Sequence, residues 1–170
     1  KRNNGRIGAA SGPLTAIPYL AKRGIQLDPQ RIVKHEVEKS DEPSNTFVEA
    51  QQRLTIKVYA HLFQYKYRTF VIGGGHETAF GHCRGLLKAL PSTCSLGIIN
   101  FDAHLDLRPL PADNVGTSGT PFTEIHKLCE MYNRVFDYTC IGLQRAATSD
   151  ELYAKARETG TTIVHHDQLD

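Results

Sequence analysis

The sequence lacks the features that mark membrane, exported and disulfide-rich proteins. No apolar stretch approaches the length of a membrane span, and residues 1–6, Lys-Arg-Asn-Asn-Gly-Arg, lack the apolar core of a signal peptide. The four cysteines are widely separated and form no Cys-x-x-Cys pair, which favours ordinary thiols over a disulfide or zinc framework. We therefore expect a soluble, cytoplasmic protein.

An excess of charge of one sign is also missing. The 20 basic and 18 acidic residues are mixed along the chain and give a net charge of +2. This balance provides no basic stripe for nucleic acid or for anionic lipid. The partner that the composition favours is a small molecule, and neither nucleic acid nor a membrane is expected.

Low-complexity segments, internal repeats and long linkers are absent as well. With 170 residues, 40% of them hydrophobic, the chain can bury a real core, and a single domain over residues 1–170 is expected. The chain begins in a polar, glycine-rich loop over residues 3–13 and stops at Asp170 with no closing element. We therefore expect an incomplete domain that lacks its first strand and its C-terminal part.

The hydrophobic pattern predicts strands and helices in alternation. Apolar runs predict strands over 67–72, 96–101, 135–143 and 162–165. Spacings of three and four predict helices over 46–63, 79–90, 120–129 and 152–158, and a weaker helix over 14–20 contains Pro18. Residues 27–44 are irregular. The order of strands and helices predicts an α/β fold with a mainly parallel sheet.

Several of these helices carry recognisable start and stop signals. Two capping boxes are expected, Thr46 with Glu49 and Thr148 with Glu151. Thr120 and Pro121 supply a cap and a first-turn proline. Pro91 and Gly160 are the expected stop signals. These signals fix the predicted ends of the helices more closely than the hydrophobic pattern does.

Three potential metal ligands follow the strand expected over 96–101. Asp102, His104 and Asp106 are spaced two apart, so in an extended segment their side chains leave the same side of the backbone. Two carboxylates and an imidazole that face one way repel or compete unless a cation joins them. Mixed oxygen and nitrogen ligands suit manganese or another borderline divalent ion.

A fourth ligand candidate follows the preceding strand. His76 comes directly after Gly73-Gly74-Gly75, where the backbone can approach an ion closely. In a parallel sheet it reaches the same carboxyl-end crevice as Asp102. The neighbouring Glu77 is either a first-turn helix acid or a partner that supports a ligating histidine.

Together these motifs resemble one enzyme family. The segments concerned are Gly-Gly-Gly-His-Glu at 73–77, Asn-Phe-Asp-Ala-His-Leu-Asp-Leu-Arg at 100–108 and Ser-Gly-Thr-Pro-Phe at 118–122. They look like the ureohydrolase (arginase, agmatinase) superfamily, and within it like the formimidoylglutamase subgroup. Residues 2–9 and 141–145 are similar to the same subgroup.

The resemblance implies a three-layer α/β/α fold and two Mn²⁺ ions that activate a water. It implies hydrolysis of N-formimidoyl-L-glutamate to L-glutamate and formamide in histidine degradation, and the family's usual assembly makes a homo-oligomer an expectation. By the same resemblance, His76, Asp102 and Asp106 would hold one ion, while Asp102 and His104 would help to hold the other.

The expected substrate carries carboxylates, and four residues are candidates to bind it: Arg108, Ser118, Gly119 and Thr120. The Arg108 guanidinium suits a bidentate grip on a carboxylate, although an exposed arginine before Pro109 is the alternative. The loop residues either orient substrate or only shape the loop and cap a helix. No catalytic side chain is assigned, because arginases resemble this chain around Ser118 but have a histidine at that position.

One expected element of the family is missing. The superfamily completes its metal centre with a later Ser-x-Asp-x-Asp-x-x-Asp-Pro segment, and no such segment lies between Asp106 and Asp170. We expect the 170 residues alone to bind manganese weakly and to have negligible activity. Two alternatives stay open: a ureohydrolase that acts on a guanidino compound such as agmatine or arginine, and a non-catalytic metal-binding protein.

Overall fold

The computed structural model describes residues 11–25, 28, 32 and 43–169, and for residues 43–46 it describes the backbone alone. The predictions for residues 2–10 and for most of the irregular segment 27–44 lie outside these ranges. The side chain of Thr46, one half of a predicted capping box, lies outside them too.

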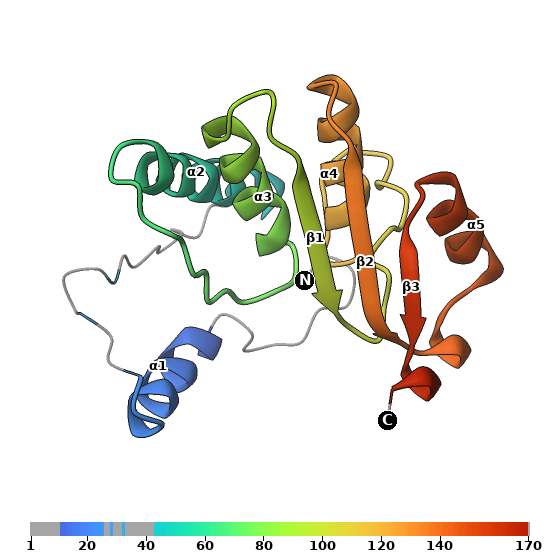
Figure 1. Ribbon diagram of the computed structural model, residues 1–170, viewed down its shortest axis with the longest axis horizontal. Helices are drawn as coiled ribbons and strands as arrows, with labels where there is room; N and C mark the ends of the chain where they lie inside the picture. The colour runs from blue at the N-terminus through green and yellow to red at the C-terminus, as the bar shows by residue number, and fades with distance from the viewer. Residues whose placement is uncertain (1–10, 26–27, 29–31, 33–42, 170) are drawn as a thin grey trace.

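Among the described residues, three parallel strands form the sheet (Figure 1). They are β1, Leu96–Phe101, β2, Phe136–Leu143, and β3, Thr162–His165, in the order β1-β2-β3. Phe101 pairs with Ile141, and Leu143 with His165, so the carboxyl ends of the strands lie at one edge of the sheet. These three predicted strands are confirmed, with β2 beginning one residue later than expected.

Five α-helices accompany the sheet in the described ranges. They are α1, Gly12–Lys22, α2, Pro43–Phe63, α3, Thr78–Ala89, α4, Pro121–Met131, and α5, Asp150–Glu158. Short 3-10 turns follow at Arg145–Ala147 and His166–Gln168. In the described part of the chain, no helix has both the length and the apolar character needed to cross a membrane.

Most helix ends differ from the predictions by one to three residues, and two of these differences concern predicted capping boxes. α2 begins at Pro43, three residues before the predicted start at Thr46. At α5 the N-cap is Ser149, whose hydroxyl accepts the Leu152 amide, so the capping box predicted from Thr148 is wrong by one residue. Thr148 instead donates to the Gln144 carbonyl oxygen in the preceding turn. The helix predicted over 14–20 is present and runs through Pro18.

A single core joins the sheet to α3, α4 and α5. Tyr138 and Cys140 of β2 point into it, and the helices contribute Leu87, Ile125 and Ala156, all almost fully buried. α2 packs on α3, and α3 packs on α4. One face of the sheet therefore rests on a helical layer, as expected for an α/β fold.

The opposite face of β1 is open in the described structure. Ile99 is 66% exposed and Phe101 is 79% exposed, although the residues that alternate with them face the core. The sequence resemblance implied helices on both faces. Among the described residues, the face that carries Ile99 and Phe101 has no such cover.

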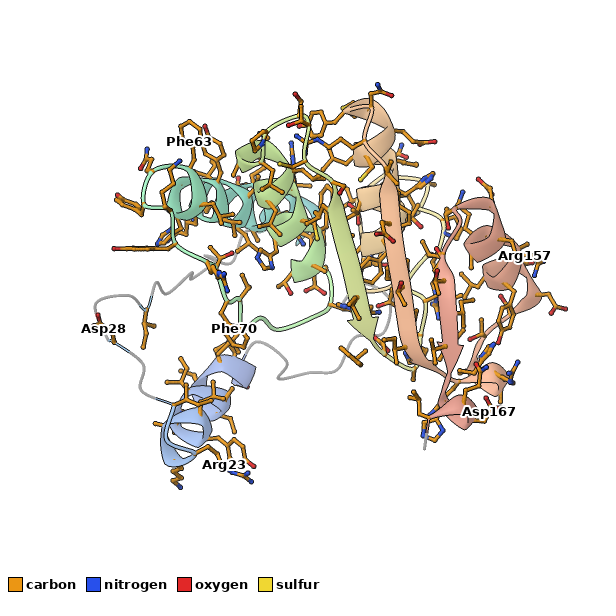
Figure 2. The ribbon with its side chains drawn as sticks, viewed as in Figure 1. Arg23, Asp28, Phe63, Phe70, Arg157 and Asp167 are labelled. Atoms are coloured by element: carbon orange, nitrogen blue, oxygen red, sulfur yellow. The ribbon has the colours of Figure 1, made fainter. Side chains whose placement is uncertain are left out.

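The strand predicted over 67–72 is wrong, because no strand forms there. The amide of Tyr67 donates to the carbonyl oxygen of His61, at the end of α2, at 3.0 Å instead of to a neighbouring strand. Phe70 is 83% exposed, and Figure 2 shows it on the connection between α2 and α3, apart from the sheet. An apolar run becomes a strand only where a partner supplies ladder hydrogen bonds.

Candidate metal centre

The segment after β1 folds into a loop that is fixed at both ends. The Asp102 amide donates to the Ile141 carbonyl oxygen at 3.0 Å, and the Gln144 amide donates to the Ala103 carbonyl oxygen at 3.1 Å. Farther along, the Phe122 amide donates to the Asp106 carbonyl oxygen at 3.3 Å. The end of β2 and the start of α4 therefore hold the segment that carries three of the predicted ligands.

This loop gathers the carboxylates by a different route from the one expected. An extended backbone was predicted to align residues 102, 104 and 106, but residues 102–104 bend and Asp106 has a φ of 46°. That left-handed conformation is uncommon outside glycine, and aspartate is among the residues that adopt it most readily. Strained backbone of this kind persists where the surroundings hold it, and it clusters at functional sites.

His76 reaches the loop from the N-terminal side of α3. The turn over residues 75–78, which contains His76, is closed by the Thr78 hydroxyl, which donates to the Gly75 carbonyl oxygen at 3.0 Å. From α2, Gln51 donates to the Glu77 carbonyl oxygen at 2.6 Å. Glu77 is the N-cap residue of α3 without a side-chain capping bond. Two helices thus fix the backbone on either side of His76.

The ligand atoms of His76, Asp102 and Asp106 all lie within 4.8 Å of one another. His76 Nδ1 is 2.6 Å from Asp106 Oδ2 and 3.2 Å from Asp102 Oδ2. The hydrogen bond that His76 donates to the Asp106 carboxylate is the largest cause that raises the pKa of His76, against the opposing effect of burial. Two carboxylates around one imidazole favour a positive charge here, and this nitrogen and oxygen donor set fits Mn²⁺.

His104 lies beside this group but outside it. Its Nδ1 is 3.3 Å from Asp102 Oδ1, while His76 faces the other oxygen, Oδ2, of the same carboxylate. The His104 side chain is 58% exposed and thus faces solvent. Asp102 therefore stands between the two histidines, with one oxygen toward each.

The residues predicted to bind substrate lie on two adjoining segments. The amide of Arg108 donates to the carbonyl oxygen of Gly119 at 3.0 Å, and the Thr123 hydroxyl donates to the Arg108 carbonyl oxygen at 2.9 Å. Ser118 is half-buried, and the Arg108 side chain is exposed. The structure therefore places Arg108 next to the Ser118 loop at the start of α4.

Thr120 has a structural part in this loop. It is 1% exposed, its hydroxyl accepts the Thr117 amide at 2.8 Å, and it donates to Glu124 Oε2 at 2.9 Å. Burial raises the pKa of Glu124, whose carboxylate lies beneath the loop. Of the two interpretations left open for Thr120, this geometry favours loop shaping over substrate contact.

Two aromatic residues beside the site were missed by the sequence-based reasoning. The ring of Phe122 meets the His76 ring edge-on, with centroids 5.4 Å apart, and stacks on Tyr138 at 4.2 Å. Burial raises the pKa of Tyr138, so its hydroxyl stays a neutral donor. The signal available was the alternation of Phe136, Tyr138 and Cys140 on one face of the predicted strand.

Comparison with protein families gives one result that spans the whole chain. The model of the Arginase family matches residues 1–170. The chain belongs to the arginase family. The sequence resemblance to the ureohydrolases is therefore confirmed, and the parallel sheet with its helices is the arginase-like arrangement expected.

Two curated members of the arginase family show which proteins of the family this chain resembles. The chain is 43% identical over 164 residues to a formimidoylglutamase of Citrobacter koseri and 41% identical over 173 aligned residues to that of Salmonella typhi. These alignments cover 96% and 99% of this chain, and 50% and 53% of the relatives. The chain thus spans about half the length of the curated relatives that it matches.

A solved structure agrees with this comparison. The crystal structure of Trypanosoma cruzi formiminoglutamase with Mn²⁺ superposes with a TM-score of 0.76 at 26% sequence identity. The superposition covers 98% of this chain and 56% of that one. The arginase-family chain therefore shares the fold of a protein that was crystallised with manganese.

Proposed function

We propose that the protein is a manganese-dependent formimidoylglutamase. The observation that carries the proposal is identity of 40–43% over nearly the whole chain to proteins of that name. The clustered His76, Asp102 and Asp106 support it, because the donor set suits the metal bound in the Trypanosoma cruzi structure. The proposed reaction adds water to N-formimidoyl-L-glutamate and yields L-glutamate and formamide.

The proposed centre would hold two Mn²⁺ ions, with Asp102 among the residues that hold each of them. His76, Asp102 and Asp106 would hold one ion, and Asp102 with His104 would help to hold the second. The position of Asp102, with one oxygen toward each histidine, supports this division. Bound manganese supplies hydroxide from water near neutral pH and neutralises the charge that develops during attack.

The chain's own residues orient the substrate in this proposal. Arg108 binds a substrate carboxylate, because a planar guanidinium donates two parallel hydrogen bonds to it. The Ser118 hydroxyl would contact the substrate from the adjoining loop, next to Gly119, whose amide donates to the Thr117 hydroxyl and whose carbonyl oxygen accepts the Arg108 amide. Thr120 and Glu124 keep that loop in place through their hydrogen bond. Substitution of Arg108 by Lys should therefore raise KM more than it lowers kcat.

An assay of the protein as its gene encodes it tests this proposal. The purified protein, loaded with Mn²⁺, is offered N-formimidoyl-L-glutamate, L-arginine and agmatine in parallel. Release of formamide from the first substrate, with at most slow turnover of the others, is the expected result. Turnover of arginine or agmatine alone would assign another ureohydrolase activity, and manganese binding without any turnover would make the protein a non-catalytic relative.

Assembly and location stay predictions that need separate measurements. Family members usually assemble, so we propose a homo-oligomer, and sedimentation of the purified protein checks it. We also propose a cytoplasmic location, which rests on the widely spaced cysteines. Cell fractionation tests that location.

A further inference from the structure

Tyr138 of β2 lies directly beneath the ligand loop. Its side chain is 1% exposed, and its hydroxyl donates to the Leu105 carbonyl oxygen at 3.0 Å. The same hydroxyl accepts a hydrogen bond from Asn100 Nδ2 at 3.1 Å. Leu105 stands between the candidate ligands His104 and Asp106. The phenol therefore fixes the backbone at the middle of the loop.

The ring of Tyr138 is connected to the remaining candidate ligand, His76, through the ring of Phe122. It stacks on Phe122 with an interplanar angle of 19°, and Phe122 meets His76 at 82°. Phe122 is 2% exposed and cannot shift without disturbing the core. One side chain of β2 is thus connected to both chain segments that carry ligands, the loop after β1 and the turn before α3.

Cys140, two residues farther along β2, supports the same loop. Its thiol is fully buried and lies 3.4 Å from the His104 carbonyl oxygen and 3.7 Å from that of Asp102. A thiol is a weak donor, so this contact is worth less than that of the phenol. Together the two side chains face the carbonyl oxygens of three loop residues.

We propose that Tyr138, assisted by Cys140, is a positioning residue for the metal ligands. A core tyrosine needs some acceptor for its hydroxyl, but this acceptor lies in the ligand loop itself, next to Asp106 with its left-handed backbone. Loss of the hydroxyl leaves the Leu105 carbonyl oxygen and the Asn100 amide without this buried partner. The loop then relaxes, and the carboxylates lose the orientation that a cation requires.

The test compares Tyr138→Phe with Tyr153→Phe in the protein as its gene encodes it. Tyr153 is a partly buried tyrosine of α5 whose ring packs against the core and lies 5.9 Å from the His165 ring. We expect Tyr138→Phe to weaken Mn²⁺ binding by roughly 10-fold or more, the usual effect of residues that support ligands, and Tyr153→Phe to leave it unchanged. Titration calorimetry measures the affinity, and electron paramagnetic resonance of Mn²⁺ reports the symmetry of its surroundings.

This inference rests on the proposed metal site. The experiment separates failure of the metal site from failure of the inference. If the unaltered protein binds no Mn²⁺, the metal site is overturned. If the unaltered protein binds and Tyr138→Phe binds equally well with the same spectrum, Tyr138 has only a packing role and the inference is overturned, even if the melting temperature falls.

A second pair of variants covers the case in which Tyr138→Phe does not fold. Cys140→Ala removes the thiol donor, whereas Cys140→Ser keeps a donor of similar size. Weaker Mn²⁺ binding by the alanine variant that the serine variant restores supports the proposal. Equal affinity of both variants and the unaltered protein overturns it.

Discussion

Asp106 combines two properties that a single substitution can separate. It accepts the short hydrogen bond from His76, and its backbone is left-handed with a φ of 46°. Asparagine tolerates this backbone about as well as aspartate but carries no charge. Asp106→Asn therefore tests the carboxylate without forcing the loop to refold.

We expect Asp106→Asn to weaken Mn²⁺ binding by more than about 100-fold, because loss of a ligand exceeds the loss typical of supporting residues. Titration calorimetry provides the measurement. Asp137→Asn, at an exposed position of β2, is the matched control and should bind as the unaltered chain does. Equal affinities of the two variants would remove Asp106 from the ligand set.

His82 on α3 gives a pH dependence away from the metal site. Its Nε2 is 2.9 Å from the Thr69 hydroxyl, and burial lowers its pKa below the ordinary 6.5. Below pH 6.5 the unfolded chain takes up a proton that the folded chain resists. The contribution of His82 to stability is therefore present above that pH and is lost as the pH falls through this region.

We expect His82→Gln to reduce the loss of stability between pH 7.5 and 5.5, because glutamine keeps a polar partner for Thr69 but does not titrate. Urea midpoints at the two pH values provide the measurement. His166→Gln, at an exposed position, is the control. An unchanged pH dependence in His82→Gln would show that burial of this histidine does not affect acid stability.

At the scale of elements, α2 and α3 approach each other closely at Gly85. A Cβ added at Gly85 would lie 2.6 Å from the Val58 Cβ and 2.9 Å from the Thr55 carbonyl oxygen. Backbone cannot give way as a flexible side chain does. The glycine therefore lets α3, and with it His76, approach α2 closely.

We expect Gly85→Ala to lower the free energy of unfolding by about 1–3 kcal/mol through overpacking. Helix propensity alone would favour alanine by about 1 kcal/mol. Overpacking and helix propensity therefore predict opposite changes in the free energy of unfolding. Denaturant unfolding decides between them, and Lys88→Ala on the exposed side of α3 is the control. A stabilised Gly85→Ala variant would mean that the two helices separate without loss.

Local patterns predicted those elements that depend on local sequence and one buried face. β1, β3 and α4 agree closely with their predicted ranges because apolar periodicity and a first-turn proline, Pro121, act within a few residues, although Thr120 makes no side-chain capping hydrogen bond. The segment 67–72 has the same apolar character, but its Tyr67 amide bonds to the end of α2. Whether an apolar run becomes a strand depends on a distant partner, which periodicity does not report.

In the candidate site, too, local sequence predicted some features, and others depend on residues far apart in the chain. The sequence indicated His76, Asp102 and Asp106 because ligand types at strand ends are visible locally, and the structure brings them together. The role of Tyr138 was not visible, since the Leu105 carbonyl oxygen that it bonds lies 33 residues away in the chain. The left-handed backbone of Asp106 was not visible either, because the spacing of residues 102–106 also fits an extended segment.

At the scale of the whole molecule, a cation that binds both segments of the site should raise the free energy of unfolding of the whole chain. The loop after β1 and the turn before α3 meet at the ligand side chains, and Phe122 packs against His76 beside them. A ligand that binds the folded chain alone stabilises it by mass action.

We expect Mn²⁺ at 100 times its dissociation constant to raise the free energy of unfolding by about 2.7 kcal/mol. Circular dichroism in increasing urea, with and without a chelator, measures the change. Asp106→Asn should show little of it at the same manganese concentration. An equal gain in that variant would indicate that manganese acts elsewhere on the protein.

The open face of β1 determines how such measurements on these 170 residues should be read. Ile99 and Phe101 give the folded chain apolar surface of a kind usually met in partly folded states, where it is detected by binding of fluorescent dyes. A dye that brightens on apolar surface will therefore bind the native chain before any unfolding begins. Its fluorescence will start high on heating, and the unfolding transition will be followed better by circular dichroism than by the dye.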